Sequence, residues 1–243
     1  MAITDLNEFQ IISGTFSVIF VVISLIIGAS ILRKYLSKKE KTFITVGLTW
    51  IFISSPWWPR SIDFILRIFF DSFLSEFAYL FLGIAFIPVA LMCWIYSFCV
   101  FVYPNYKSKI LTVFILIFIV YEFFLLLFLF TNPKLIGFVD GFYAEFSLFT
   151  ISYQFFAIIT FLITGILFTR ESLKSMDQRI RWKGRFLLIA FISFTISALY
   201  ESAAPLTTLS LALIRILLIS SALEYYLGFF LPEFISKRLI KET

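Results

Sequence analysis

Few ionisable residues lie inside the long apolar stretches of this sequence, and two of them carry opposite charges. The stretch FILIFIVYEFFLLLFLF, Phe114 to Phe130, holds sixteen apolar or aromatic residues and one acid, Glu122. The stretch LALIRILLISS holds one base, Arg215. A charge at the centre of a bilayer costs at least about 2.5–3.5 kcal/mol, so such residues usually face neighbouring helices and have partners. With a rise of about 1.5 Å per residue, both lie slightly to the outer side of their segments' centres. We therefore expect Glu122 to pair with Arg215.

Other polar residues fall in the same layer. Gln154, Tyr200 and Glu201 lie in the outer halves of their apolar segments, and a long arginine could reach Glu201 instead of Glu122. Glu122, Arg215, Gln154, Tyr200 and Glu201 are candidates for a site for a small ligand or ion that opens toward the outside. An arginine suits this role because its planar fork matches a carboxylate or a phosphate. The alternative is a structural ion pair that only fixes helix packing.

A second polar group lies at the inner end of the last apolar segment. Glu224 follows Arg215 by nine residues, which turns it to the opposite side of a helix. Tyr225 is its neighbour, and Arg185 or Lys183 could extend to it from the segment before. We interpret Glu224, Tyr225 and Arg185 as a structural group or as a link between the bundle and the cytoplasmic face.

The elements that hold these residues are membrane helices. The chain of 243 residues is 61% hydrophobic and 14% charged, against about 25% charged in soluble domains. Apolar stretches long enough to cross a bilayer fill nearly all of it, which leaves no room for a soluble domain. We predict an all-α polytopic protein, one domain over residues 1–243, with seven spans. The expected spans are 9–32, 42–58, 73–103, 110–130, 147–169, 186–202 and 206–231.

The positive charges give the direction of these spans. Sixteen of the twenty Lys and Arg residues lie in RKYLSKKEK, PNYKSK, RESLKSMDQRIRWKGR and PEFISKRLIKET. The opposite set of connections holds Arg60, Arg67 and Lys134. Because cytoplasmic loops carry the excess of Lys and Arg, we predict that the N-terminus is outside and the C-terminus is cytoplasmic. The basic residues are then topology signals that contact anionic lipid, and we expect no nucleic-acid partner.

The stretch SSPWWPRSIDFILRIFFDS predicts a short amphipathic helix at about 60–72, beyond the second span. Its charged residues recur at spacings of three and four, which places them on one helical face. It is either a solvated extension with ion pairs along its surface or a lid over an outer cavity. In the third span, Pro88 predicts a kink because proline lacks an N–H.

Residue types and motifs that the sequence lacks limit the classes of function that it can have. The chain contains no histidine, so the commonest metal ligand and neutral-pH proton carrier are lacking. We see no nucleophile elbow, no phosphate-binding glycine loop and no metal-ligand spacing. We predict no metal and no cofactor, and the sequence gives no positive sign of an enzyme.

Three stretches, LTWIFISSPWWP, GILFTRESLKS and RILLISSALEYYLGFFLPEFI, resemble segments of uncharacterised archaeal seven-helix membrane proteins. Their layout is similar to that of the membrane modules in some prokaryotic sensor kinases. The resemblance implies the fold and a location in the cell membrane; it implies no substrate and no functional residue.

The function that we expect first is a sensor-like or receptor-like protein. It would bind a small ligand from outside and signal through a partner on its basic cytoplasmic loops. The second is a small-molecule or ion transporter with the Glu and Arg residues as its site. The third is a protein that interacts with lipid or serves in assembly.

Overall fold

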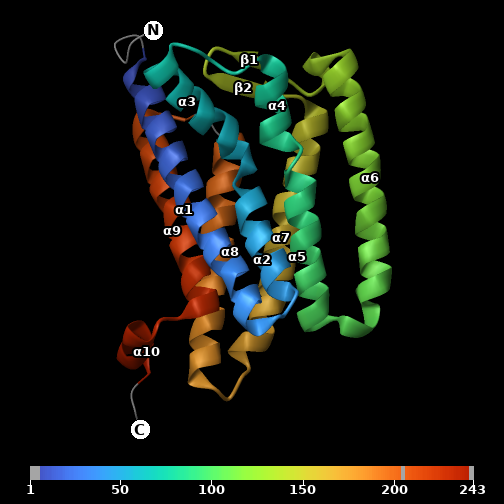
Figure 1. Cartoon of the computed structure of the whole chain (residues 1–243), viewed down its shortest axis with the longest axis vertical. Helices are drawn as coiled ribbons and strands as arrows, with labels where there is room; N and C mark the ends of the chain where they lie inside the picture. Colours follow the sequence, from blue (N-terminus) through green and yellow to red (C-terminus); the bar gives the residue numbers. More distant parts are fainter. Residues whose placement is uncertain (1–5, 204–205, 241–243) are drawn as a thin grey trace.

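The chain forms a bundle of long helices with a small β-hairpin at one end (Figure 1). The computed structural model describes residues 6–203 and 206–240. Its helices are α1 (Glu8–Lys38), α2 (Thr42–Ile53), α3 (Trp58–Phe70), α4 (Glu76–Ile84), α5 (Ile87–Val102), α6 (Lys107–Thr131), α7 (Leu148–Leu173), α8 (Gln178–Ala203), α9 (Thr208–Phe230) and α10 (Glu233–Leu239). Three short 3₁₀ turns, η2 (Ser55–Trp57), η3 (Pro104–Tyr106) and η4 (Pro133–Leu135), join some of them.

Six segments of the described chain are long and apolar enough to cross a membrane. They are Glu8–Lys38, Glu76–Val102, Pro104–Thr131, Leu148–Leu173, Gln178–Ser202 and Thr208–Phe230. The protein is therefore a multi-pass membrane protein, built almost entirely of helices as predicted. Six of the seven expected spans coincide with these segments, although α1 and α8 extend further toward their basic ends than the sequence indicated.

The seventh expected span, residues 42–58, is not one long helix. α2 ends at Ile53 after 12 residues, and the chain continues through η2 into α3. Pro56 and Pro59 explain the interruption, because a proline lacks the N–H that would continue the helical hydrogen bonds. α2, η2 and α3 together follow the bundle from one end to the other (Figure 1).

A second interruption lies beside the first. α4 ends at Ile84 and α5 begins at Ile87, just before Pro88, so the predicted kink in this span is confirmed. The two interruptions pack on each other: the Phe86 ring stacks on Phe52 at 5.4 Å and lies 5.2 Å from Trp58. Two broken helices therefore meet at one level of the bundle.

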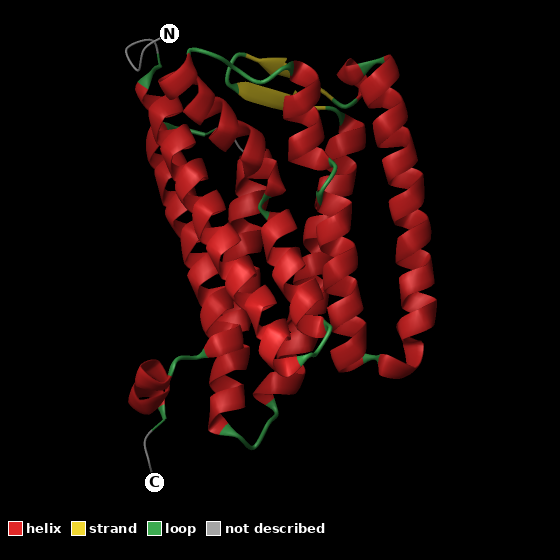
Figure 2. Ribbon diagram, viewed as in Figure 1, coloured by secondary structure: helices red, strands yellow, loops and turns green. Residues whose placement is uncertain are grey.

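The loop after α6 contains a hairpin that the sequence analysis did not predict. Strands β1 (Gly137–Asp140) and β2 (Tyr143–Phe146) pair antiparallel, with Gly137 opposite Phe146. Gly141 has a φ of 58° at the turn, a conformation that glycine adopts without steric cost. Figure 2 shows this hairpin lying across the end of the bundle.

Close packing of small and aromatic residues forms the core. Gly28 of α1 and Gly47 of α2 let their backbones approach, since a Cβ on Gly28 would lie 2.9 Å from the carbonyl oxygen of Gly47. Further into the bundle, Trp50 stacks on Tyr225 at 4.0 Å and joins α2 to α9. Trp94 is also buried, and its Nε1 donates to the hydroxyl of Thr164 at 2.7 Å.

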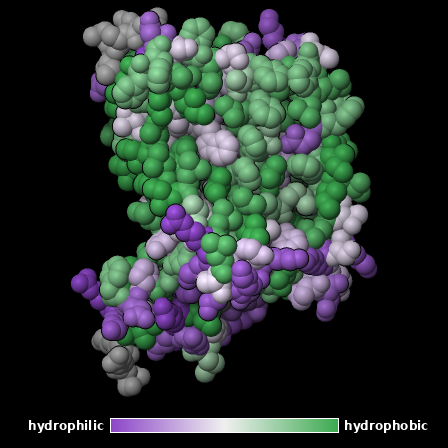
Figure 3. All heavy atoms as spheres, in the orientation of Figure 1, coloured by the Kyte–Doolittle hydropathy of each residue, from purple (hydrophilic) through white to green (hydrophobic). Residues whose placement is uncertain are grey.

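The helices differ in how far they are surrounded. α9 packs against α8 and α1, whereas α6 packs mainly against α5 and stands at the opposite side of the bundle from α9 (Figure 1). On the face shown in Figure 3, hydrophobic residues cover the middle and hydrophilic residues gather at the end that carries α10. This distribution is typical of a protein whose middle contacts lipid.

Candidate functional site

The charged face of α3 points into the protein. Ser61 and Asp63 are buried, whereas Phe69 and Phe70 are 73% and 69% exposed. α3 matches the predicted amphipathic helix, and Asp63 and Arg67 form an ion pair along it as the solvated-extension alternative expected, but Asp63 is buried, so this part of the charged face is not solvated. Because its apolar face is the exposed one, α3 suits contact with lipid on one side and with a polar interior on the other.

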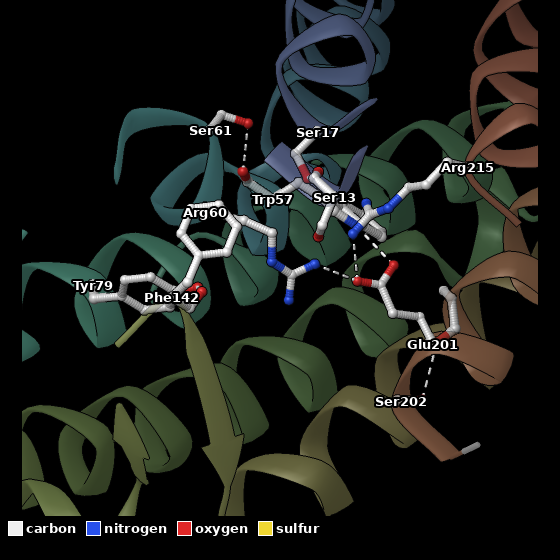
Figure 4. A network of polar contacts seen from close by, with 11 residues as sticks. Ser13, Ser17, Trp57, Arg60, Ser61, Tyr79, Phe142, Glu201, Ser202 and Arg215 are labelled. Atoms are coloured by element: carbon white, nitrogen blue, oxygen red, sulfur yellow. Dashed lines mark hydrogen bonds and ion pairs between the residues drawn. The ribbon is translucent and has the colours of Figure 1, made fainter. Parts of the chain in front are cut away.

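A cluster of three charges lies where α3, α8 and α9 meet (Figure 4). Arg60 donates from Nη1 to Oε1 of Glu201 at 2.7 Å, and Arg215 donates from Nη2 to the same oxygen at 2.7 Å. Oε2 of Glu201 accepts from Nε1 of Trp57 at 2.9 Å. We call Arg60, Glu201, Arg215 and Trp57 the Glu201 cluster. Burial alone would lower the pKa of Arg60, but the Glu201 carboxylate raises that pKa overall, so Arg60 stays charged.

The two arginines have hydrogen-bond donors to spare. Arg215 is fully buried, and its Nε and Nη1 have no hydrogen-bond partner among the described residues; the same holds for Nε of Arg60. The guanidinium of Arg215 lies 5.7 Å from the centre of the Trp57 ring, within cation–π range. In terms of charge, the cluster contains two cations, Arg60 and Arg215, and one anion, Glu201.

A cavity of about 550 Å³ lies next to this cluster. Its walls come from α2, η2, α3, α5, the strand β2, α7 and α8, and they meet beside the two helix interruptions. The polar lining residues are Arg60, Glu145, Gln154, Glu201 and Ser202. The others are apolar: Ile53, Pro56, Trp57, Ile87, Ala90, Leu91, Ala144, Phe146, Ile151, Ala157, Ile158, Phe161, Phe194 and Ala198. A volume of this size, with a few convergent polar groups, is typical of small-molecule sites.

The hairpin lines the cavity with β2 and is tied to α3 and α4. Nη2 of Arg67 donates to the carbonyl oxygen of Gly141 at 2.8 Å, and its Nε pairs with the Asp63 carboxylate. The Tyr79 hydroxyl donates to the carbonyl oxygen of Phe142 at 3.2 Å. Burial raises the pKa of Tyr143 to about 12, so this phenol next to Arg60 stays neutral at ordinary pH. These contacts fix β2 against the cavity.

The structure brings three of the five predicted site residues together. Glu201 and Gln154 line the cavity, and Arg215 bonds to Glu201 behind its wall. Tyr200 is 40% exposed and does not line the cavity, because one residue along a helix turns the side chain by about 100°.

The expected pairing of Glu122 with Arg215 is wrong. Arg215 bonds to Glu201, which was the alternative partner, and Oε1 of Glu122 is buried without a hydrogen-bond partner in the described part of the chain. Glu122 lies on α6, and Arg215 lies on α9 at the other side of the bundle (Figure 1). Next to Glu122, the Tyr121 ring stacks on Tyr153 of α7 at 3.6 Å, so aromatic packing fixes this part of α6.

The inner group forms only in part. Tyr225 is buried on Trp50, but Arg185 is exposed and lies over the Trp182 ring at 4.4 Å. Glu224 accepts from the Ser220 hydroxyl at 2.6 Å, one helical turn earlier, and is not paired with Arg185 or Lys183 within the described ranges. A link from Glu224 to Arg185 is therefore not formed.

Sequence analysis missed Arg60, Trp57 and Glu145 as parts of the site. The charge spacing on residues 60–71 predicted a helix that was either a solvated extension or a lid over an outer cavity, without naming Arg60 as a residue of the site. The hairpin that carries Glu145 had no comparable signal. Within the described residues, no group of three or more His, Cys, Asp or Glu residues is placed to hold a metal ion.

No family model matches this chain, and no curated protein matches it either. The resemblance to archaeal seven-helix proteins stays a prediction. What the site does must therefore be argued from its own geometry.

Proposed function

We propose that this protein is a seven-helix sensor or receptor that binds a small ligand from the outer side of the cell membrane. The observation that carries the proposal is the cavity of about 550 Å³ with the Glu201 cluster in its wall. Buried charges with unused donors beside a preformed, mostly apolar cavity are the usual signature of a ligand site. The packing role of the cluster accounts for the ion pairs but not for the cavity.

The proposed topology has seven crossings, with α2 and η2 making the second. α1 begins and α9 ends at opposite ends of the bundle (Figure 1), and an odd number of crossings agrees with this. The Lys and Arg residues after α1, before α6, between α7 and α8, and on α10 lie at the end opposite the hairpin. By the positive-inside rule, the hairpin and the cavity face outward and α10 lies in the cytoplasm.

Signalling is favoured over transport by the packing on the inner side of the cavity. Phe161 and Phe194 line the cavity, and Phe161 packs on Phe191, which in turn packs on Tyr225. These rings are buried, so they separate the cavity from the basic end. Because α8 carries Glu201 at its outer end and continues to Gln178, a shift of α8 would reach a cytoplasmic partner docked on the basic loops.

A transporter is the second candidate, and the two broken helices favour it. In many transporters, discontinuous helices form the substrate site near the middle of the membrane. Here the α2/α3 and α4/α5 interruptions border the cavity. A role in lipid interaction or assembly without a ligand is the third candidate.

Ligand screening by thermal shift, followed by flux measurements in proteoliposomes, tests the proposal. The blocking variant is Ala144→Trp, which fills the cavity from the edge of β2; the control is Phe138→Trp, on the exposed side of β1. A sensor gives stabilising ligands that Ala144→Trp abolishes and Phe138→Trp does not, with no flux. Flux of such a ligand would establish the transporter instead, and a lack of any Ala144-dependent ligand would leave the third candidate.

The direction of insertion is tested separately. A tag inserted at Gly141 should be reachable from outside intact cells, and a fluorescent protein fused to Thr243 should report cytoplasm. Labelling of Gly141 only after the cells are broken open would overturn the outward-facing cavity.

A further inference from the structure

We infer that the ligand is an amphipathic anion, with a carboxylate or phosphate head group and an apolar body. The inference rests on the proposed function, since it names the chemistry that the same cavity selects. It follows from three features: the charge balance of the Glu201 cluster, the position of Arg60 in the cavity wall and the composition of the walls.

The buried charges at the cavity wall do not balance. Arg60 and Arg215 both bond to one carboxylate, so one positive charge remains in excess. The second oxygen of that carboxylate already accepts a hydrogen bond from the Trp57 N–H, so it offers less to the second arginine. An excess cation in a poorly hydrated site gains most from an anion that binds beside it.

Arg60 is the cation of the cluster that an anion in the cavity can contact. Its side chain is 17% exposed, and it bonds to Glu201 through Nη1 alone, while its Nε is buried without a hydrogen-bond partner among the described residues. Arg60 lines the cavity, so a ligand there can contact it directly, whereas Arg215 acts from behind the wall. A carboxylate or phosphate oxygen next to the guanidinium of Arg60 would gain a charge-assisted hydrogen bond, which is stronger than one between neutral groups.

The rest of the cavity suits an apolar body. Beyond the charged corner its walls are aliphatic and aromatic, with Ile87, Leu91, Ile158, Phe161 and Phe194 among them. A small hydrophilic anion would leave these walls without contacts, whereas an alkyl or aromatic body would fill them.

A second acid in the lining, besides Glu201 of the cluster, opposes a negative ligand. Glu145 lines the cavity from β2, but it is exposed and forms no ion pair with Arg60 in the described structure. Water therefore screens its charge more than it screens the buried cluster. Removing the charge of Glu145 should therefore leave anion binding unchanged or strengthen it, whereas removing the charge of Arg60 should weaken it.

Calorimetric titration in a non-ionic detergent, with empty micelles as the blank, tests the charge selectivity. The probes are octanoate, octanol and octylammonium, which share one chain length and differ in head-group charge. The wild-type protein should bind octanoate at least about tenfold more tightly than octanol, since a hydrogen bond between charged groups is stronger than one to a neutral hydroxyl. Equal binding of octanol, or preference for octylammonium, would overturn the inference.

The variants identify the cation. Arg60→Gln should weaken octanoate binding about tenfold or more and leave octanol binding unchanged, and Arg60→Lys should recover part of the affinity. Glu145→Gln should bind octanoate as tightly as wild type or more tightly. Lys134→Gln, which removes an exposed cation away from the cavity, is the control for surface charge. Loss of octanoate binding in Lys134→Gln, or none in Arg60→Gln, contradicts the assignment.

Two sources could supply this chemistry, a membrane phospholipid or a free organic acid. Mass spectrometry of lipids retained by the purified protein separates them. A phospholipid kept by wild type and lost from Arg60→Gln, with displacement by octyl phosphate, identifies the lipid. No retained anionic lipid together with octanoate binding identifies the free acid. If neither is bound, the inference fails.

Failure of the inference differs from failure of the proposed function. Should octanol bind as well as octanoate, with both blocked by Ala144→Trp, the cavity would remain a ligand site and only the anion selectivity would be wrong. Should no ligand of any charge depend on Ala144, both would fail.

Discussion

Glu201 and Glu122 are two acids in the apolar part of one protein, and their surroundings differ completely. Glu201 accepts hydrogen bonds from two arginines and a tryptophan, in a corner formed by α3, α8 and α9. Glu122 lies on α6, half-buried among aromatic residues, and one of its oxygens is buried with no partner in the part of the chain that the structure describes. The depth of an acid in the membrane therefore does not decide its role; the helices beside it do.

The largest expected effect is that of Glu201→Gln. The substitution leaves two buried guanidiniums next to each other without a counter-charge, and breaking a buried pair costs about 3–5 kcal/mol. We expect the free energy of unfolding, measured by denaturant titration in mixed micelles, to fall toward the upper end of that range. A loss below about 1 kcal/mol would mean that the cluster does not stabilise the bundle.

Arg215→Gln is expected to cost less than Glu201→Gln, because Arg60 still neutralises Glu201. We expect a loss near the lower end of about 3–5 kcal/mol. In the double variant Glu201→Gln/Arg215→Gln the losses should not add, since both members of the pair are gone. Additive losses in the same titration would show that the two side chains are not coupled.

Trp57→Phe ranks third. It removes one N–H that donates to the Glu201 carboxylate, and a hydrogen bond to a charged group contributes about 1.5–3 kcal/mol. Because the smaller ring also loses packing against Phe20 and Phe194, the same change is measured in the Glu201→Gln background. A glutamine can still accept from the indole N–H, so the difference between the two backgrounds gives the part of the hydrogen bond that depends on the carboxylate charge. Equal losses would mean that this charge contributes nothing.

The smallest effect is predicted for Glu122→Gln. The structure gives this carboxylate no charged partner among the described residues, so no ion pair is broken. We expect the free energy of unfolding to stay within about 0.5 kcal/mol of wild type or to rise, because a charge leaves apolar surroundings. Combined with Arg215→Gln, the effects should add. Non-additive effects of Glu122→Gln and Arg215→Gln would mean that Glu122 does pair with Arg215. The difference between Glu122 and Glu201 drawn above would then be wrong.

The sequence placed Glu122 and Arg215 at one depth, and depth was the only coordinate that the helical rise could supply. It could not show that α6 and α9 lie on opposite sides of the bundle (Figure 1). A better signal was present: Glu201 and Arg215 are only 14 residues apart, on either side of a short connection. Helices joined by short connections pack antiparallel as neighbours, which brings residues near the connection together.

The amphipathic helix gives the converse case. The spacing of Arg60, Asp63 and Arg67 predicted one charged face, and α3 confirms it. Periodicity states which residues share a face but not which face is buried. In water the charged face would be exposed. Beside lipid it faces the protein interior, and Arg60 on this face lines the cavity.

By itself, the sequence determined the membrane fold, the positions of the long helices, the kink before Pro88 and the asymmetry of positive charge. These follow from local composition, because a bilayer accepts only long apolar helices whose backbone groups are satisfied internally. Only the tertiary structure decided that Arg60, Trp57 and Arg215 converge on Glu201, that a hairpin lines the cavity and that Glu122 has no such partners among the described residues. Those features depend on which helices are neighbours and how each is rotated, and both are fixed by side-chain packing between segments far apart in the chain.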